Sequence, residues 1–455
     1  MIELTMWELL FWGLLQAFAV ALIVRRVVPS LKVTGPVVMW KSHRGLKKVA
    51  ALAKKHHRFW KAYGDFGIIL AFGLVGALYV FRKYRGKKKW LYSAVASLFL
   101  LSPTLSTMVI YLLTGESYMT TNSLFVGDLW AQAFFQLFLL CFGYSFSLVL
   151  LIAQSAIDIV VGYLSGAAVQ AAVAPALPGV SVKGSPFQIP WYGWLAFPIL
   201  IFVHELSHGI LVKAQGLRLK ATGLLMFGIF PLGAFVEPDE KQLLKAPAHE
   251  QLRVYSVGSA ANYLTSFAVL ALFIMAMMPV LDAAGFYDRY DSYYDHPLIG
   301  DVLETSDGYG RLEPGTRILS INGTSIPSIA ALHDATASAG PGALLMMQTD
   351  GGTFGVRLSG ESMIGVTGLV DTFREMPLDM QAIAWTIRFL GLVVFFNFIV
   401  GVMNLLPMYP LDGGFMLQAF VSTKKGKKKA KLVAKAMTVF VLLLLAINML
   451  PLFLS

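Results

Sequence analysis

Three ionisable side chains, His204, Glu205 and His208, interrupt the otherwise apolar stretch FPILIFVHELSHGILV. Residues four positions apart on a helix lie on one face, so the two imidazoles can bind one metal ion. Glu205 lies beside them, where its carboxylate can accept a proton from a metal-bound water molecule. Two histidines packed in a helix core would be the alternative, but ionisable groups inside an apolar span are costly and mark functional sites. The spacing therefore predicts a zinc site with a general base.

A hydrolytic zinc ion needs a third protein ligand. Asp412, in NLLPMYPLDGGFMLQAF, is the best candidate because few other acidic residues have apolar surroundings. Pro407 and Pro410 prevent a regular helix before it, and irregular backbone at membrane depth is tolerated where it is buried or lines a watery cavity. The alternative is that Asp412 only caps a short helix. Glu237 and Asp239 are rival acids, but their polar neighbours indicate a surface loop.

The composition indicates a polytopic membrane protein. Of the 455 residues, 56% are hydrophobic and 14% are charged, whereas soluble proteins carry roughly a quarter charged residues. The net charge of +11 comes mainly from three stretches, Arg25–Lys61, Arg82–Lys89 and Lys424–Lys435, and each adjoins an apolar segment. Such stretches are typical of cytoplasmic loops. We therefore expect the lipid bilayer, and no nucleic acid, among the partners.

The apolar runs predict an all-α membrane bundle with about eight transmembrane helices. They lie near residues 7–24, 66–81, 91–113, 130–153, 191–213, 252–280, 383–406 and 432–454. Between the sixth and seventh runs, alternating segments with Asn-Gly, Asp-Gly and Gly-Gly turns predict a small β-rich domain. Four parts are therefore predicted. Residues 1–178 form an N-terminal transmembrane region with a basic cytoplasmic loop, and residues 179–282 form the first part of the catalytic core. Residues 283–378 form the insert, and residues 379–455 form the second part of the catalytic core.

Three motifs in one order resemble the site-2 proteases, a family of intramembrane zinc metalloproteases. They are HELSH on an apolar helix, GSAAN at Gly258–Asn262 on the next, and then NLLPMYPLDGG. The resemblance covers about residues 190–420. It implies a zinc-dependent endopeptidase that cuts the transmembrane segments of other proteins.

The same resemblance assigns roles to individual residues. It implies that His204, His208 and Asp412 hold Zn²⁺ and that Glu205 is the general base. It also implies that Asn262 and Asn404 lie near the site and support the substrate or the transition state. For Asn262, helix packing beside Gly258 is the alternative.

Two further segments resemble parts found in that family. LEPGTRILSINGTSI, Leu312–Ile326, resembles the core of a PDZ domain, with Thr316 where aspartate is usual. The resemblance implies an α+β domain that binds extended peptide by strand addition; a spacer without a ligand is the alternative. LRLKATGLLMFGIFPLGAF, Leu217–Phe235, resembles a re-entrant β-hairpin whose edge pairs with an unwound substrate. A short interfacial helix is the alternative there.

The charges also predict the orientation in the cell membrane. Lys213, Arg218 and Lys220 follow the HELSH helix, and the 424–435 lysines follow Asp412, so the site should lie near the cytoplasmic face and the insert outside. Prenyl-protein and HtpX-like metalloproteases share the H-E-x-x-H spacing, but they use a glutamate ligand and lack the insert. A non-catalytic scaffold with a PDZ-like module is the remaining alternative, while a transporter would require inverted halves.

Overall fold

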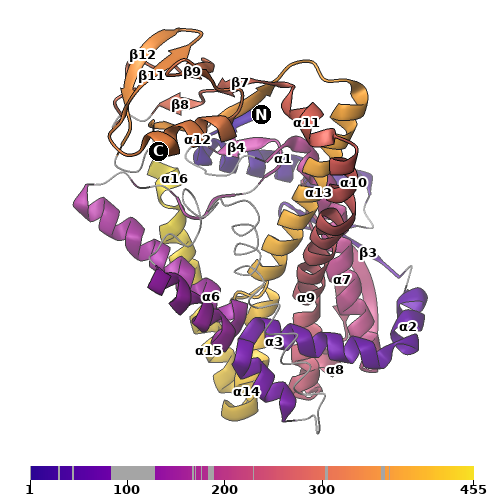
Figure 1. The fold of residues 1–455 in the computed structure, drawn as a ribbon. Helices are drawn as coiled ribbons and strands as arrows, with labels where there is room; N and C mark the ends of the chain where they lie inside the picture. The colour runs from indigo at the N-terminus through magenta and orange to yellow at the C-terminus, as the bar shows by residue number, and fades with distance from the viewer. Residues whose placement is uncertain are drawn as a thin grey trace. The chain divides into compact units, whose positions relative to one another are not determined.

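Helices make up most of the described residues in a computed structural model (Figure 1). It describes residues 2–28, 31–43, 46–82, 129–166, 169, 171–175, 177–182, 189–228, 230–302, 306–359, 364–367 and 369–454. The chain forms two compact units. One comprises Met1–Leu270 with Phe389–Ser455, and the other comprises Ala271–Arg388. We describe each unit by itself.

Seven of the described helices or helix runs are long and apolar enough to cross a membrane. They are Met6–Val27, His57–Phe81, Phe134–Ser165, Trp191–Ala214, Ala248–Ala283, Leu378–Met403 and Lys427–Met449. In the element order they correspond to α1, α3, the main part of α6, η1 with α7, α9 through α10, α13 and α15. Each matches one predicted apolar run, and the eighth run, 91–113, lies outside the described residues. The chain is thus a polytopic membrane protein.

Two of the long helices break where they meet each other. α3 (His57–Phe81) has a non-helical residue at Gly73, with φ 56°, and α6 (Leu129–Ser165) has one at Gly143, with φ 67°. A Cβ on Gly73 would lie 2.6 Å from the backbone nitrogen of Gly143, and a Cβ on Gly143 would lie 2.5 Å from that of Gly73. Only glycine permits both the positive φ and this approach of one backbone to the other.

A four-stranded antiparallel sheet packs against the HELSH helix. Its order is β2-β3-β5-β6, with bounds Lys32–Thr34, Val37–Ser42, Leu219–Phe227 and Phe230–Pro238. β5 and β6 form the hairpin predicted at 217–235. β3 adds to it from the basic N-terminal loop, pairing Trp40 with Leu224. Because β5 lies between β3 and β6, β6 has one edge without a partner strand among the described residues, and β6 also contacts α7.

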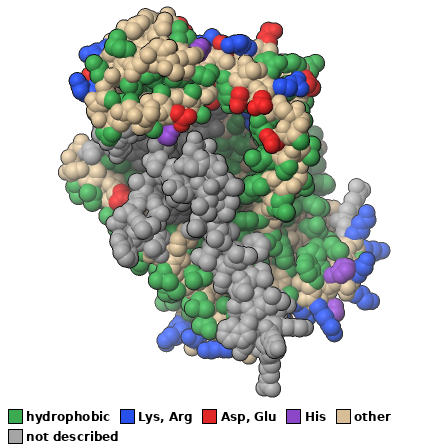
Figure 2. All heavy atoms as spheres, viewed as in Figure 1, with side chains coloured by type: hydrophobic (Ala, Val, Ile, Leu, Met, Phe, Trp, Pro, Cys, Tyr) green, Lys and Arg blue, Asp and Glu red, His purple; other side chains and the backbone are tan. Residues whose placement is uncertain are grey.

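Short elements complete the membrane unit. The helices are α2 (Leu46–Lys55), α8 (Glu240–Lys245), α14 (Asp412–Lys425) and α16 (Pro451–Leu454), and β1 (Ile2–Leu4) pairs in parallel with β4 (Val180–Val182). Lysine and arginine side chains gather around α2 and at the junction of α14 and α15 (Figure 2). These are two of the basic stretches noted in the sequence.

The second unit is a small α+β arrangement. Its main sheet has the order β10-β9-β11-β12, with bounds Thr324–Ser325, Ile318–Ile321, Leu344–Thr349 and Gly352–Arg357. The helices are α11 (Phe286–Asp291) and α12 (Ile329–Ala339), and β7 (Tyr294–Leu298) and β8 (Asp301–Val302) pair with β14 (Val370–Phe373) and β13 (Val366–Thr367). Along β11, Leu345 and Met347 are buried while Leu344 and Met346 are exposed, so period-two alternation selects one face for the core.

Candidate metal centre

The helix α7 (Phe197–Ala214) presents two imidazoles toward one point. Its apolar residues and the proline in its first turn favour the helix. His204 and His208 lie one turn apart, and their Nε2 atoms are 3.1 Å from each other. Both rings are largely buried, with side-chain exposures of 10% and 13%.

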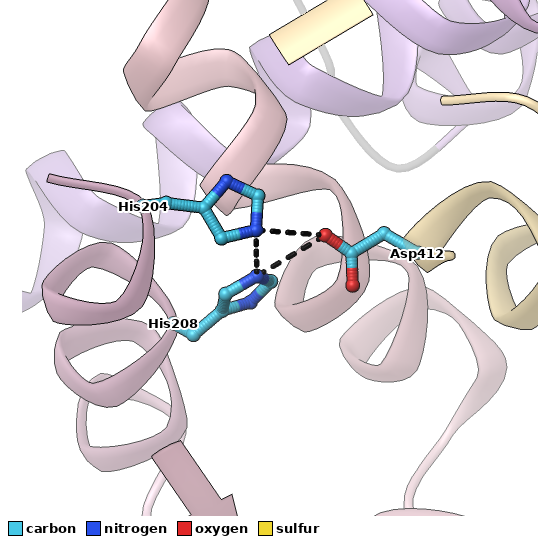
Figure 3. Close-up of side chains that lie close together, drawn as sticks. All are labelled: His204, His208 and Asp412. Carbon is cyan, nitrogen blue, oxygen red and sulfur yellow. Dashed lines mark hydrogen bonds and ion pairs between the residues drawn. The ribbon is translucent and has the colours of Figure 1, made fainter. Parts of the chain in front are cut away.

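Asp412 reaches the same point from the end of an irregular segment that separates two helices. α13 (Leu378–Met403) ends before the prolines, and α14 begins at Asp412 itself. The N–H of Gly413 donates to the carbonyl of Asn404 at 2.8 Å, which folds the chain back at this break. Oδ2 of Asp412 then lies 3.3 Å from Nε2 of His204 and 3.2 Å from Nε2 of His208 (Figure 3).

This triangle fits a tetrahedral metal ion. Two ligand atoms that each lie 2.0–2.1 Å from such an ion are about 3.3 Å apart, and the three separations here are 3.1, 3.2 and 3.3 Å. Two imidazole nitrogens and one carboxylate oxygen are donors that zinc accepts, and three protein ligands leave a fourth position open. Among the described residues, the three form the one group of His, Cys, Asp or Glu with this convergence.

The adjacent helix α9 (Ala248–Leu272) orients both rings. The carbonyl of Val254 lies 2.7 Å from Nδ1 of His208, and because a carbonyl only accepts, Nδ1 carries the proton and leaves Nε2 with its lone pair. Nδ2 of Asn262 lies 3.2 Å from Nδ1 of His204. If Nε2 of His204 binds a metal, its Nδ1 must carry the proton and donate it. Rotation of the Asn262 amide by half a turn exchanges its nitrogen and oxygen, so that the oxygen accepts this hydrogen bond.

Gly258 leaves space for this arrangement. A Cβ at that position would lie 2.3 Å from Nε2 of His208 and 2.6 Å from Nε2 of His204. The backbone of α9 therefore lies directly against the ligand atoms. Gly258 and Asn262 share a face of α9, which explains the G-x-x-x-N spacing in physical terms.

Glu205 lies between the two histidines in sequence and beside them in space. It is half-buried, and its carboxylate accepts a hydrogen bond from the backbone N–H of Val236 in β6. Val236 pairs with Thr222 across the hairpin, so an N–H that reaches Glu205 belongs to the edge of β6 that β5 leaves unpaired. The free strand edge and the candidate base are thus neighbours.

The structure brings together five of the six predicted site residues. His204, His208 and Asp412 converge, Glu205 lies beside them, and Asn262 contacts His204. Asn404 contributes its carbonyl to the turn before Asp412, but within the described residues no hydrogen bond joins its side chain to the cluster. The rival acids have other partners, since Glu237 pairs with Lys41 and Asp239 caps α8. The sequence could not indicate the role of Val254, because this residue acts through its backbone carbonyl and every residue type has one.

Comparisons with known proteins agree with this geometry. The profile of peptidase family M50 matches residues 192–447, more than half of the chain. The chain therefore belongs to peptidase family M50, and the resemblance to the site-2 proteases is confirmed.

Two relatives extend the comparison. An uncharacterised protein of Methanocaldococcus jannaschii is 30% identical over 250 residues, which cover 53% of this chain and 60% of that protein. An Arabidopsis thaliana protein named membrane-bound transcription factor site-2 protease homolog is 30% identical over 128 residues, which cover 28% of this chain and 23% of that protein. The chain thus matches less than two thirds of either relative's length.

Proposed function

We propose that this protein is a zinc-dependent intramembrane endopeptidase that cleaves transmembrane segments of other membrane proteins. The observation that carries the proposal is the convergence of His204, His208 and Asp412, whose ligand atoms come from segments 204 positions apart. Family membership supports the reaction class. A carboxylate from an aspartate at a broken helix also favours the site-2 type over metalloproteases that use a glutamate ligand.

Each residue of the centre has a part in the proposed reaction. When bound, a zinc ion activates water and polarises the scissile carbonyl. His204, His208 and Asp412 hold it, while Asn262 and the Val254 carbonyl keep the imidazoles oriented. Glu205 accepts a proton from the attacking water and returns it to the leaving amine. The Val236 N–H fixes the Glu205 carboxylate on the side of the ligand atoms.

We propose that the substrate binds as an added strand. A transmembrane helix hides its peptide bonds within its own hydrogen-bond ladder, so it must unwind before cleavage, and glycine, proline or asparagine near the cut would favour this. The unpaired edge of β6 offers alternating N–H and C=O groups for an unwound segment. Because Glu205 reaches that edge at Val236, a segment paired there would carry its peptide bonds past the base.

The proposal also covers the second unit and the orientation of the protein in the membrane. We propose that residues 283–378, within the second unit, form a PDZ-like domain outside the cytoplasm that binds extended peptide and so filters substrates by their ectodomains. The combination of a small four-stranded sheet with helix α12 supports this class of fold. The lysines of α14 and α15 and those after α7 support an active site near the cytoplasmic face.

The test pairs metal analysis with cleavage of a synthetic transmembrane peptide that carries a central Gly-Pro. We expect the native chain and Glu205→Gln to retain one zinc ion, and cleavage by the variant to fall by about 10²- to 10⁴-fold because the general base is lost. Glu237→Gln is the matched control, since this acid lies on β6 and pairs with Lys41. Equal cleavage by the native chain and Glu205→Gln would refute the mechanism, and no zinc in either would refute the metal site.

A further inference from the structure

A carboxylate buried inside the membrane unit joins α3 to α9. Asp65 is 4% exposed, and it receives two hydrogen bonds from Arg253, with Nε 2.7 Å from Oδ1 and Nη2 2.6 Å from Oδ2. Nε2 of His249 lies 3.0 Å from Oδ1. A two-pronged pair of this kind is directional, and charges at such depth persist only with good geometry. It therefore fixes the register of α3 against α9.

Close backbone packing continues the same contact. A Cβ on Gly64 would lie 2.9 Å from Cβ of Arg253, and a Cβ on Gly67 would lie 2.7 Å from Oγ of Ser256. The hydroxyl of Ser256 donates to the carbonyl of Gly64 at 3.0 Å. With glycines at the contact, α3 lies directly against one face of α9. Movement of either helix would disturb all of these contacts together.

The other face of α9 holds the metal-binding side chains of α7. Val254, Gly258 and Asn262 are spaced by four residues and therefore share that face. Val254 follows Arg253 directly in the chain, and its carbonyl is the group that holds Nδ1 of His208 at 2.7 Å. α9 thus contacts both α3 and α7, which also contact each other, and the position of the α9 backbone decides where the Val254 carbonyl lies.

We propose that Asp65 is a positioning residue for the metal centre. By holding Arg253, it fixes the first turns of α9, so that the Val254 carbonyl keeps His208 in the tautomer and orientation that present Nε2 to the ion. The inference rests on the proposed function in one respect, namely that His204, His208 and Asp412 bind a metal. It gives α3, which carries no ligand, a defined role in the reaction.

The test uses the full-length chain and measures metal binding as well as cleavage. For Asp65→Asn we expect the zinc dissociation constant to rise about 10- to 100-fold, as is usual when support for a ligand is lost. We also expect an altered visible spectrum of the cobalt-substituted protein, and a lower kcat with little change in KM for the peptide. Asp65→Glu keeps the charge and should recover part of the affinity.

Asn448→Leu is the matched control. It removes another buried hydrogen bond between helices, from Asn448 Nδ2 to the Ile152 carbonyl at 2.9 Å, which joins α15 to α6. We expect it to lower thermal stability but to leave zinc affinity and the cobalt spectrum unchanged. A purely structural role for Asp65 would give the same pattern as this control.

Three outcomes would overturn the proposal. Native zinc affinity and cobalt spectrum in Asp65→Asn would do so directly. If that variant does not fold, Arg253→Lys, which keeps the charge but loses the second hydrogen bond, must shift the spectrum, and an unchanged spectrum overturns the proposal. A native chain that binds neither ion overturns both proposals. Zinc binding without cleavage refutes only the proposed function, and metal affinity still tests Asp65.

Discussion

Replacing Gly258 with alanine should weaken metal binding severely while leaving most of the fold intact. The added Cβ would lie 2.3 Å from Nε2 of His208 and 2.6 Å from Nε2 of His204. Ordinary contacts between such atoms are about 3.5 Å, so the His208 ring must move by roughly 1 Å. Ligand distances tolerate only about 0.2 Å. The displaced ring can therefore no longer bind together with its two partners.

The expected magnitude follows from this displacement. We expect the zinc dissociation constant of Gly258→Ala to rise at least about 100-fold, which corresponds to about 2.8 kcal/mol. Cleavage of the transmembrane peptide should be lost in proportion to the metal. Competition with a coloured chelator measures the affinity, and thermal unfolding of the metal-free protein reports on the fold separately.

Gly209→Ala is the matched control because Gly209 follows His208 directly. A Cβ at Gly209 would meet Val49 at 3.4 Å and Val236 at 3.6 Å, which are ordinary contacts. We expect this variant to bind zinc as the native chain does. If Gly258→Ala also bound zinc with native affinity, the close approach of α9 to the ligand atoms would be wrong, and the explanation of the G-x-x-x-N spacing would fail.

Three further predictions concern the same centre. Asn262→Leu should weaken zinc binding about 10-fold or more because Nδ1 of His204 loses its partner; native affinity in a chelator titration would contradict this. Ala234→Pro removes one backbone N–H from the β6 edge, so it should lower kcat/KM for the peptide by about tenfold, the effect of one lost hydrogen bond. Gly233→Ala is its control and should leave kcat/KM unchanged, because a Cβ there meets open space. Removing zinc should destabilise the native chain and Glu205→Gln alike, by about 2.7 kcal/mol relative to zinc at 100 times its dissociation constant, and unchanged thermal unfolding with chelator would argue against a bound metal.

Local patterns in the sequence predicted the parts of the site that depend on spacing. The four-residue step between His204 and His208 fixes their common face on any helix. Asp412 stood out because an acid next to two prolines in apolar surroundings has few explanations. Seven apolar runs became long helices for the same reason, since hydrophobic length alone decides whether a segment can cross a membrane.

Features that depend on distant partners could not be predicted in this way. β3, Val37–Ser42, lies in a basic loop and becomes a strand because it pairs with β5. Asp65 and Arg253 are 188 positions apart, and each alone indicates only a charge near a membrane span. The role of Gly258 follows from the 2.3 Å that would separate an added Cβ from Nε2 of His208, and this close approach exists only after α7 and α9 have packed.

The separation of the ligands along the chain has a consequence for biosynthesis. His208 and Asp412 are 204 positions apart, and a ribosome adds roughly 5–20 residues each second, so both imidazoles are made about 10 to 40 s before the carboxylate. During that interval the nascent chain holds Glu205 and two imidazoles but only two of the three ligand groups. Helices of other nascent membrane proteins nearby are then not exposed to a complete centre. If the three side chains act as proposed, the order of synthesis itself delays activity until Asp412 reaches the two imidazoles.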